Sequence, residues 1–301
     1  MAIIFEDPGF ASEHPAAAGL FITDLDGTLL SSERKLSAAA RSALERLGRA
    51  GVVRVVATGR SLFSFNTVAA ADWPVDFVIF STGAGVIQRP GERLVRRVDL
   101  ENAALRTAFD ALCALGLDVM VQRPVPDSHL FGFKAQSRSN PDFERRLSLY
   151  QRFVFPLDND IAAFGPASQL VAIVPAAEGP RALAAVRAEL PGFTVIQTTS
   201  PLDGRSMWIE IFPPEVSKSR TAAWLAAKLR IPHARTASVG NDFNDLDLLE
   251  WTRERFVVAN APRDLSLRFP TVASNNDGGV AEAVERWLAQ KREATSREER
   301  V

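Results

Sequence analysis

Residues 20–30, Leu-Phe-Ile-Thr-Asp-Leu-Asp-Gly-Thr-Leu-Leu, constrain the fold of this chain more than any other segment. Apolar or β-branched residues fill the space between Gly19 and an abrupt polar turn, which predicts a buried central strand over 20–23. Asp24 and Asp26 follow that strand at its carboxyl end, the edge at which open α/β sheets bind ligands. Gly27 lets backbone amides approach an anion closely. The segment therefore predicts a ligand site at the end of a central strand.

The two carboxylates also predict a metal ion. Carboxylates this close repel each other unless a cation lies between them, and oxygen-seeking Mg²⁺ is the usual partner. The same letters are compatible with a surface turn or part of a calcium loop. An EF-hand loop, however, needs further oxygen ligands and a Glu at its twelfth position, whereas Ala, Ser and Leu dominate the residues after Leu30. A magnesium site is the favoured interpretation.

Composition excludes several classes of function. The 301 residues carry a formal net charge of −1, so no basic excess is available to hold nucleic acid or an anionic membrane. No apolar run approaches the roughly 18 residues of a membrane span, and the N-terminus lacks the pattern of a secretory signal. We therefore expect a cytoplasmic protein.

Cys113, the only cysteine, lies in a helical apolar pattern and is expected in the core. His14, His129 and His233 are too scattered for a zinc site or a serine-type triad.

The first third of the chain alternates buried-type strands with helices. Strands are expected over 20–23, 52–57 and 77–80, with a helix over 36–50. Ser37 is a possible cap of that helix. The second and third strands end in polar turns that begin at Thr58 and Ser81. This order predicts an α/β fold in which a parallel sheet carries helices on both faces.

From about residue 85 the pattern changes. Segments 86–88 and 94–98 flank a turn-forming stretch and predict a hairpin. Mixed elements come next, with helices expected over 101–115, 141–152 and 178–190 and strands over 118–122, 170–174, 193–197 and 207–212. The alternating pattern then resumes, with helices expected over 217–229 and 245–251 and strands over 236–239 and 256–259.

This change of pattern predicts two domains. We expect a core of residues 1–85 and 213–301, with an inserted α+β domain at 86–212. The highly charged segment 290–301 is expected to form a solvated tail.

The run from Asp24 to Thr28 resembles the D-x-D-G-T signature of the haloacid dehalogenase (HAD) superfamily of phosphatases and phosphomutases. The resemblance implies a Rossmann-like doubly wound parallel sheet and three further motifs, each at the end of a strand. Thr58 resembles the second motif, whose hydroxyl and following amides hold phosphoryl oxygens. Lys218 opens a helix after two prolines and resembles the third, whose ammonium offsets the charge of nucleophile and phosphate.

Residues 240–245, Gly-Asn-Asp-Phe-Asn-Asp, resemble the fourth motif, usually G-D-x-x-N-D, with one departure. Counting back from Asn244 and Asp245 places Asn241 where a metal-binding carboxylate is expected. Asn241 can still ligate Mg²⁺ through its carbonyl oxygen, whereas Asp242 becomes the ligand if the loop shifts by one residue. Asp245 is placed to bond Lys218 or a metal-bound water. The sequence leaves open whether Asn241 or Asp242 binds the metal.

Further turns resemble the Cof-like, sugar-phosphatase-type branch of the superfamily. Ser81-Thr82-Gly83-Ala84 resembles its S-N-G-A turn, and its α/β cap lies between the second and third motifs, where 86–212 falls. The resemblance implies that the cap selects the substrate and that the substrate is a sugar phosphate or another small phosphorylated metabolite. Polar candidates in the cap, each more often an ordinary surface residue, are Arg123, His129, Lys134 and Arg138.

The resemblance assigns roles. Asp24 is the nucleophile, Asp26 protonates the leaving oxygen and later takes a proton from water, and Mg²⁺ is the cofactor. The expected catalytic residues are Asp24, Asp26, Thr58 and Lys218. The expected substrate-binding residues are Gly59, Arg60, Thr82, Gly83 and Asn244. The expected metal-binding residues are Asp24, Asp26, Asn241, Asp242 and Asp245.

Two alternatives to hydrolysis stay open. Phosphomannomutases share this kind of cap and start, and they transfer phosphate between sugar phosphates instead of to water. The amide at Asn241 is also compatible with a chain that binds phosphorylated ligands without turnover. Nothing in the sequence indicates an oligomeric state.

Overall fold

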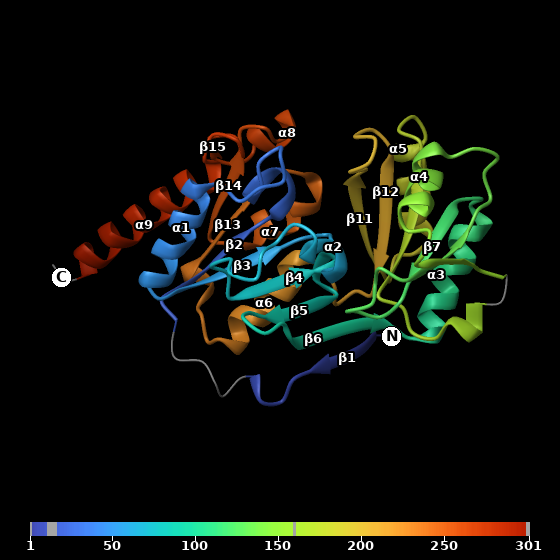
Figure 1. Ribbon diagram of the computed structural model, residues 1–301, viewed down its shortest axis with the longest axis horizontal. Helices are drawn as coiled ribbons and strands as arrows, with labels where there is room; N and C mark the ends of the chain where they lie inside the picture. The colour runs from blue at the N-terminus through green and yellow to red at the C-terminus, as the bar shows by residue number, and fades with distance from the viewer. Residues whose placement is uncertain (1, 11–16, 159–160, 299–301) are drawn as a thin grey trace.

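Two β-sheets organise the chain, one in each lobe of the computed structural model, which describes residues 2–10, 17–158 and 161–298 (Figure 1). Within these residues the larger, core sheet has nine strands, in the spatial order β1 (Ala2–Glu6), β6 (Arg93–Leu100), β5 (Gly85–Gln88), β4 (Phe77–Phe80), β3 (Val52–Ala57), β2 (Gly19–Thr23), β13 (Thr236–Gly240), β14 (Glu254–Val258) and β15 (Thr271–Val272). Six neighbouring strands are parallel, namely β4, β3, β2, β13, β14 and β15. Beyond β4, each of the strands β5, β6 and β1 pairs antiparallel with the strand before it in the sheet. The predicted α/β class is confirmed.

Helices cover both faces of the core sheet. The core helices are α1 (Ala38–Arg49), α2 (Leu62–Asn66), α6 (Lys218–Lys228), α7 (Leu246–Trp251), α8 (Arg263–Ser266) and α9 (Gly279–Glu298). The apolar sides of α1 and α9 pack with Phe21 and Val56 on one face, and α6 packs with Leu20 and Ile22 on the other. Every residue of β2 is buried, because neighbouring strands and these helices enclose it. This burial explains its continuous apolar sequence.

The second sheet forms the other lobe. Within the described residues its strands run β11 (Thr194–Thr199), β12 (Met207–Phe212), β10 (Gln169–Val174), β7 (Asp118–Gln122), β8 (Phe131–Lys134) and β9 (Val154–Pro156). Its helices are α3 (Asn102–Ala114), α4 (Pro141–Leu149) and α5 (Gly179–Glu189). Side chains of α3 and α5 pack on one face of the sheet, while Phe143 of α4 packs on the other. We call this lobe the cap.

The structure corrects the expected start of the cap at residue 86. The predicted hairpin is present, but β5 pairs with β4 and β6 pairs with both β5 and β1 in the core sheet. The chain reaches the cap only after Leu100. The reason is the tight turn at Ser81–Gly83, which folds β5 back beside β4, so that the hairpin extends the core sheet. β1 was not predicted, because its partner β6 lies far along the sequence.

The segment 290–301, expected to be a solvated tail, is mostly helical in the structure. Helix α9 continues to Glu298, and residues 299–301 lie outside the described part of the chain. The helix is held by Val280, Ala283, Val284 and Trp287, which are buried, and its later residues are mostly good helix formers. Among the described residues, no helix has the length and apolarity needed to cross a bilayer.

Candidate active site

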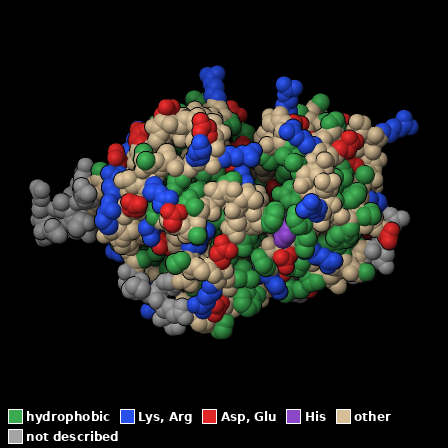
Figure 2. All heavy atoms as spheres, viewed as in Figure 1, with side chains coloured by type: hydrophobic (Ala, Val, Ile, Leu, Met, Phe, Trp, Pro, Cys, Tyr) green, Lys and Arg blue, Asp and Glu red, His purple; other side chains and the backbone are tan. Residues whose placement is uncertain are grey.

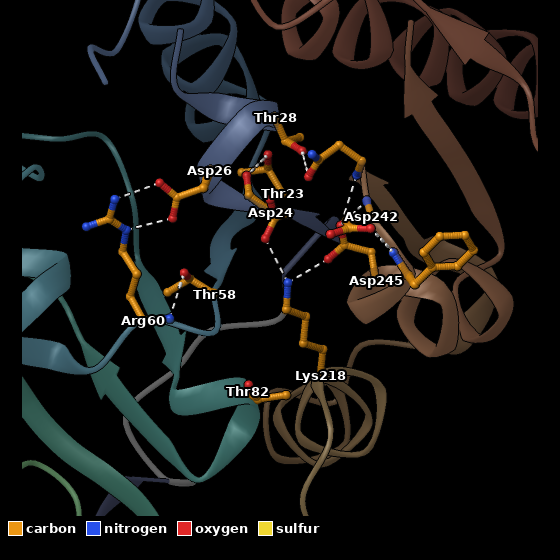
Figure 3. Close-up of polar contacts among 12 residues, drawn as sticks. Thr23, Asp24, Asp26, Thr28, Thr58, Arg60, Thr82, Lys218, Asp242 and Asp245 are labelled. Atoms are coloured by element: carbon orange, nitrogen blue, oxygen red, sulfur yellow. Dashed lines mark hydrogen bonds and ion pairs between the residues drawn. The ribbon is translucent and has the colours of Figure 1, made fainter. Parts of the chain in front are cut away.

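The site begins where β2 ends, between the ends of β3 and β13. The Asp24 amide donates to the Val239 carbonyl at 2.9 Å, which holds the nucleophile candidate against the neighbouring strand. The chain then turns through Gly27, which has a φ of 72°. A Cβ on Gly27 would lie 2.6 Å from the Asn241 side-chain nitrogen, so only glycine fits both the backbone and the contact. The two carboxylates of the segment point in different directions (Figure 3).

Asp24 points to a buried lysine. Lys218 Nζ donates to Asp24 Oδ1 at 2.7 Å and to Asp245 Oδ1 at 2.6 Å, and neither Lys218 nor Asp245 is exposed (Figure 3). Burial opposes the ammonium charge, but the two carboxylates outweigh it and raise the pKa of Lys218. Burial, followed by the charge of Asp245, raises the pKa of Asp24 to about 7, although Lys218 acts in the opposite direction. The predicted contact between Lys218 and Asp245 is present.

Asp245 also holds the loop of the fourth motif. Its Oδ2 accepts hydrogen bonds from the backbone N–H groups of Asn241 at 2.9 Å and Asp242 at 3.2 Å. Both of its oxygens are therefore committed within the protein. Asp245 therefore holds both the Lys218 ammonium and the loop of the fourth motif, and its expected role as a metal ligand stays a prediction.

Asn241 and Asp242 have different surroundings. The Asn241 Oδ1 position lies 3.2 Å from Asp24 Oδ2, 3.0 Å from the Asp26 carbonyl oxygen and 3.0 Å from Thr28 Oγ1. Asp242 instead accepts from the Phe243 N–H at 2.7 Å and begins a short helical turn. The side chain that faces Asp24 is therefore that of Asn241. Turning the amide by 180° would let its nitrogen donate to the same three oxygens.

Asp26 is held by an arginine. Arg60 Nε and Nη2 donate to its two carboxylate oxygens at 2.6 and 2.7 Å, and Arg60 Nη1 donates to the Ser64 hydroxyl at 3.0 Å (Figure 3). Bidentate pairs of this kind fix orientation as well as charge. Arg60, expected to bind substrate, thus contacts the general acid candidate directly, and that contact was not predicted.

The expected phosphate-binding loops divide into two groups. Thr58, Gly59 and Asn244 line a cavity between the two sheets, and the Thr58 hydroxyl accepts from the Arg60 N–H at 3.1 Å. Thr82 and Gly83 lie beside it without lining it. The Thr82 hydroxyl donates to Glu210 Oε2 of the cap at 3.0 Å. A Cβ on Gly83 would lie 2.6 Å from the Ser217 carbonyl, so this glycine serves packing against the start of α6.

The cavity between the core and cap sheets has a volume of about 670 Å³. Its core wall includes Asp24, Asp26 and Asn241, and its cap wall includes His129. Other polar and aromatic cap residues that line it were not predicted, chiefly Gln122, Arg146, Gln169, Trp208 and Glu210. A usable signal was available for two of them, because Gln169 and Glu210 are single polar residues in otherwise apolar strands.

Three of the four cap candidates do not line the cavity. Arg123 Nη1 donates to the Phe164 carbonyl at 2.6 Å and lies over two phenylalanine rings. The Lys134 ammonium lies over the Phe109 ring, and Arg138 is exposed. Only His129 is where the prediction placed it.

Comparison with known proteins identifies the family of the chain. Residues 21–284 match the model of the haloacid dehalogenase-like hydrolase family. A 5-amino-6-(5-phospho-D-ribitylamino)uracil phosphatase of Bacillus subtilis is 26% identical over 285 residues, which cover 88% of this chain and 96% of the relative. The phosphatase YwpJ of B. subtilis is 25% identical over 311 residues, covering 89% and 99%.

Solved structures show the same fold. A haloacid dehalogenase-like hydrolase from B. subtilis superposes with a TM-score of 0.69 at 19% identity, over 89% of this chain and 99% of that one. A HAD subclass IIB sugar phosphatase superposes with a TM-score of 0.68 at 16% identity, over 89% and 98%.

A buried lysine joins two carboxylates at the strand ends of a doubly wound sheet, under a cap, as expected for the HAD type of core. The chain belongs to the haloacid dehalogenase-like hydrolase family. Within that family it is a phosphoric monoester hydrolase.

Proposed function

We propose that this protein is a Mg²⁺-dependent phosphatase that hydrolyses a small phosphorylated metabolite, of the sugar phosphate kind, through an aspartyl-phosphate intermediate. The observation that carries the proposal is the Lys218 ammonium shared by the Asp24 and Asp245 carboxylates at the end of β2. It fixes one oxygen of Asp24 and leaves Oδ2 directed toward Asn241. The relative that acts on a phosphorylated ribityl compound supports a substrate of this size and polarity.

The donor set at Asn241 fits a magnesium ion. With its amide oxygen toward the site, Asn241 faces Asp24 Oδ2 and the Asp26 carbonyl at 3.2 and 3.0 Å. Octahedral Mg²⁺ binds oxygen at about 2.0–2.1 Å, which places neighbouring ligand oxygens about 3 Å apart. We assign these three oxygens, one of them a backbone carbonyl, as the donors on the basis of these distances. Among the described residues, no group of three His, Cys, Asp or Glu side chains is placed to hold a metal ion. The ion would supply charge neutralisation between the phosphoryl group and the nucleophile.

The residues of the chain then divide the work. The Asp24 carboxylate attacks phosphorus, the ester P–O bond breaks, and the leaving oxygen takes a proton from Asp26. Water next attacks the aspartyl-phosphate, its proton passes to Asp26, and phosphate leaves with Asp24 restored. Lys218 holds Asp24 in place, and the Thr58 hydroxyl with the neighbouring amides and Asn244 receive the phosphoryl oxygens. Arg60 holds both oxygens of Asp26 at the cavity wall, so proton transfer requires one of these two hydrogen bonds to break.

The test is hydrolysis of p-nitrophenyl phosphate by the purified protein, with Mg²⁺ and with EDTA, beside Asp24→Asn. We expect turnover that EDTA abolishes, that excess Mg²⁺ restores, and that is lost in the variant while its thermal unfolding stays cooperative. Turnover that persists in folded Asp24→Asn would refute the assigned nucleophile. Activity that required a bisphosphate activator would favour the phosphotransferase alternative. A cytoplasmic location stays a prediction.

A further inference from the structure

The cap wall of the cavity carries a row of polar side chains on one face of the cap sheet. Gln169 of β10 and Gln122 of β7 are direct partners across the two strands. Glu210 of β12 is the partner of Val171, two residues along β10 from Gln169, so it lies on the same face. Thr198 of β11 is the partner of Trp208, two residues from Glu210, and shares that face as well. All four line the cavity.

These side chains are buried without full hydrogen bonding. Gln169 is 3% exposed, and its Oε1 accepts no hydrogen bond from the described residues. The Thr198 hydroxyl, also buried, has no partner among them either. Buried polar atoms of this kind cost stability unless something else bonds them. In a cavity that adjoins the proposed catalytic site, a bound substrate can supply that partner.

Arg146 of α4 lines the same cavity as the row of polar side chains. The Arg146 guanidinium of α4 lies 4.2 Å from the Trp208 ring centroid, and its Nε, which is buried, donates to no described residue. Trp208 is fixed in turn, because its indole N–H donates to Asp142 at 2.7 Å. Arg146 therefore offers a preorganised donor at the cavity, held against a rigid ring.

The Glu210 carboxylate joins this row to the catalytic loops. It is 5% exposed and accepts from the Thr82 hydroxyl at 3.0 Å, which leaves further acceptor capacity at the cavity wall. The wall thus combines acceptors, at Gln169 and Glu210, with donors, at Arg146 and Thr198. A carboxylate or a second phosphate brings mainly acceptors and cannot satisfy both kinds. A hydroxyl both donates and accepts, and it suits the Gln169 amide in either of its two orientations.

We propose that Gln169, Glu210, Arg146 and Thr198 form the site that recognises the leaving group, and that this group is neutral and carries neighbouring hydroxyls. The inference rests on the proposed phosphatase function and narrows it. Gln169 is the specificity-determining residue, because its oxygen is the most deeply buried acceptor of the row that lacks a partner. A site built to bond hydroxyls discriminates strongly against groups that lack them.

The experiment compares kcat/KM for p-nitrophenyl phosphate, ribitol 5-phosphate, ribose 5-phosphate, glucose 6-phosphate and 6-phosphogluconate. Glucose 6-phosphate has a neutral sugar end, whereas 6-phosphogluconate has a carboxylate there. The variants are Gln169→Leu, Gln169→Glu, which keeps an acceptor, and the control Gln197→Leu. Gln197 belongs to β11 but points to the other face of the cap sheet, and it does not line the cavity.

We expect the wild type to prefer glucose 6-phosphate over 6-phosphogluconate. Relative to p-nitrophenyl phosphate, kcat/KM for the best hydroxylated substrate should fall about tenfold in Gln169→Leu, the loss of one buried hydrogen bond. Gln169→Glu should recover part of this ratio, and Gln197→Leu should leave it unchanged. An unchanged ratio in Gln169→Leu, or a preference for 6-phosphogluconate, would overturn the inference. Hydrolysis of p-nitrophenyl phosphate alone would overturn it and leave the phosphatase standing, whereas no hydrolysis at all would refute the proposed function.

Discussion

The amide of Asn241 stands where the fourth motif usually has a carboxylate, and its surroundings explain how the site tolerates the exchange. Asp24 supplies one negative charge at this position, and the Asp26 carbonyl and the Asn241 amide supply neutral oxygens. Asp242, one residue further on, is used to begin a helical turn. Because one formal charge is missing, we expect a magnesium site that is weaker than one with two carboxylates.

Replacing the two candidates separately tests which of them binds the metal. Asn241→Ala should raise the Mg²⁺ concentration for half-maximal activity by about tenfold or more, since an oxygen facing Asp24 is lost. Asn241→Asp should lower that concentration, because it restores a charge. Asp242→Asn is the matched control and should change it little, as asparagine also caps helical turns. Titration of activity with Mg²⁺ measures all three, and a larger effect at Asp242 than at Asn241 would reverse the assignment.

Asp99 gives a pH-dependent prediction away from the site. It is 1% exposed on β6, and burial raises its pKa to about 6 from the ordinary 3.8, although Arg97 acts against this. The folded state therefore binds the proton more tightly, and stability falls as pH rises from about 4 to about 6. Asp99→Asn removes this penalty. We expect it to stabilise the fold on the order of 3 kcal/mol above pH 6 and to have little effect near pH 4.

The control is Asp7, a carboxylate whose pKa is lowered in the folded protein, whereas that of Asp99 is raised. Arg93 donates to Asp7 at 2.6 Å and lowers the pKa of Asp7, so Asp7→Asn should reduce stability at neutral pH. Thermal unfolding of both variants between pH 4 and pH 8 makes the comparison. A lower melting temperature for Asp99→Asn at pH 7 would show that the carboxylate stabilises the fold and would contradict the prediction.

At the scale of elements, the turn after β2 links the backbone to the metal site. Gly27 has a φ of 72°, and Asn241 fills the space where its side chain would be. Gly27→Ala should cost about 1–2 kcal/mol of stability through backbone strain and should also displace Asn241, which raises the Mg²⁺ requirement. Gly116→Ala is the control, because Gly116 has a φ of 70° with open space around it, in the cap. It should lose similar stability and keep the wild-type Mg²⁺ dependence.

The core elements and their motifs were predictable because their signals are local. The apolar run of β2, the strand β3 before Thr58 and the Ser37 cap of α1, whose hydroxyl accepts from the Ala40 N–H, all lie within a few residues of the structure they specify. β1 was not predictable in this way, because its only described sheet partner is β6. The cap wall was missed because its polar row forms only when β7, β10, β11 and β12 come together, although the lone polar residues Gln169 and Glu210 gave a local signal.

At the scale of the whole molecule, hydrogen bonds and aromatic contacts join the two lobes. On the face shown in Figure 2, hydrophobic side chains gather where the lobes meet, while charged ones are dispersed. Besides the bond from Arg220 to Thr194, hydrogen bonds cross the junction, one between the Ser81 and Ser128 hydroxyls and one from the Thr82 hydroxyl to Glu210. Both lie beside the cavity, so the closeness of the lobes and the shape of the site depend on each other.

An aromatic cluster at this junction yields a prediction about the joining of the lobes. Phe63 of α2, in the core, is 41% exposed and stacks on His129 of the cap at 4.6 Å, and both contact Phe153. Burial lowers the pKa of His129, which favours the neutral ring in this stack. Aromatic pairs contribute about 0.5–1.5 kcal/mol, so Phe63→Ala should weaken the closed arrangement by about that amount. We expect kcat/KM to fall about two- to tenfold, mainly through KM, and proteolysis after Leu100 to become faster.

Leu267→Ala, at a residue 75% exposed on the core, is the control and should change neither measurement. If the two variants behave alike, the cluster does not hold the cap against the core, and other contacts between the lobes, among them the hydrogen bonds of Ser81, Thr82 and Arg220, must account for the closed cavity.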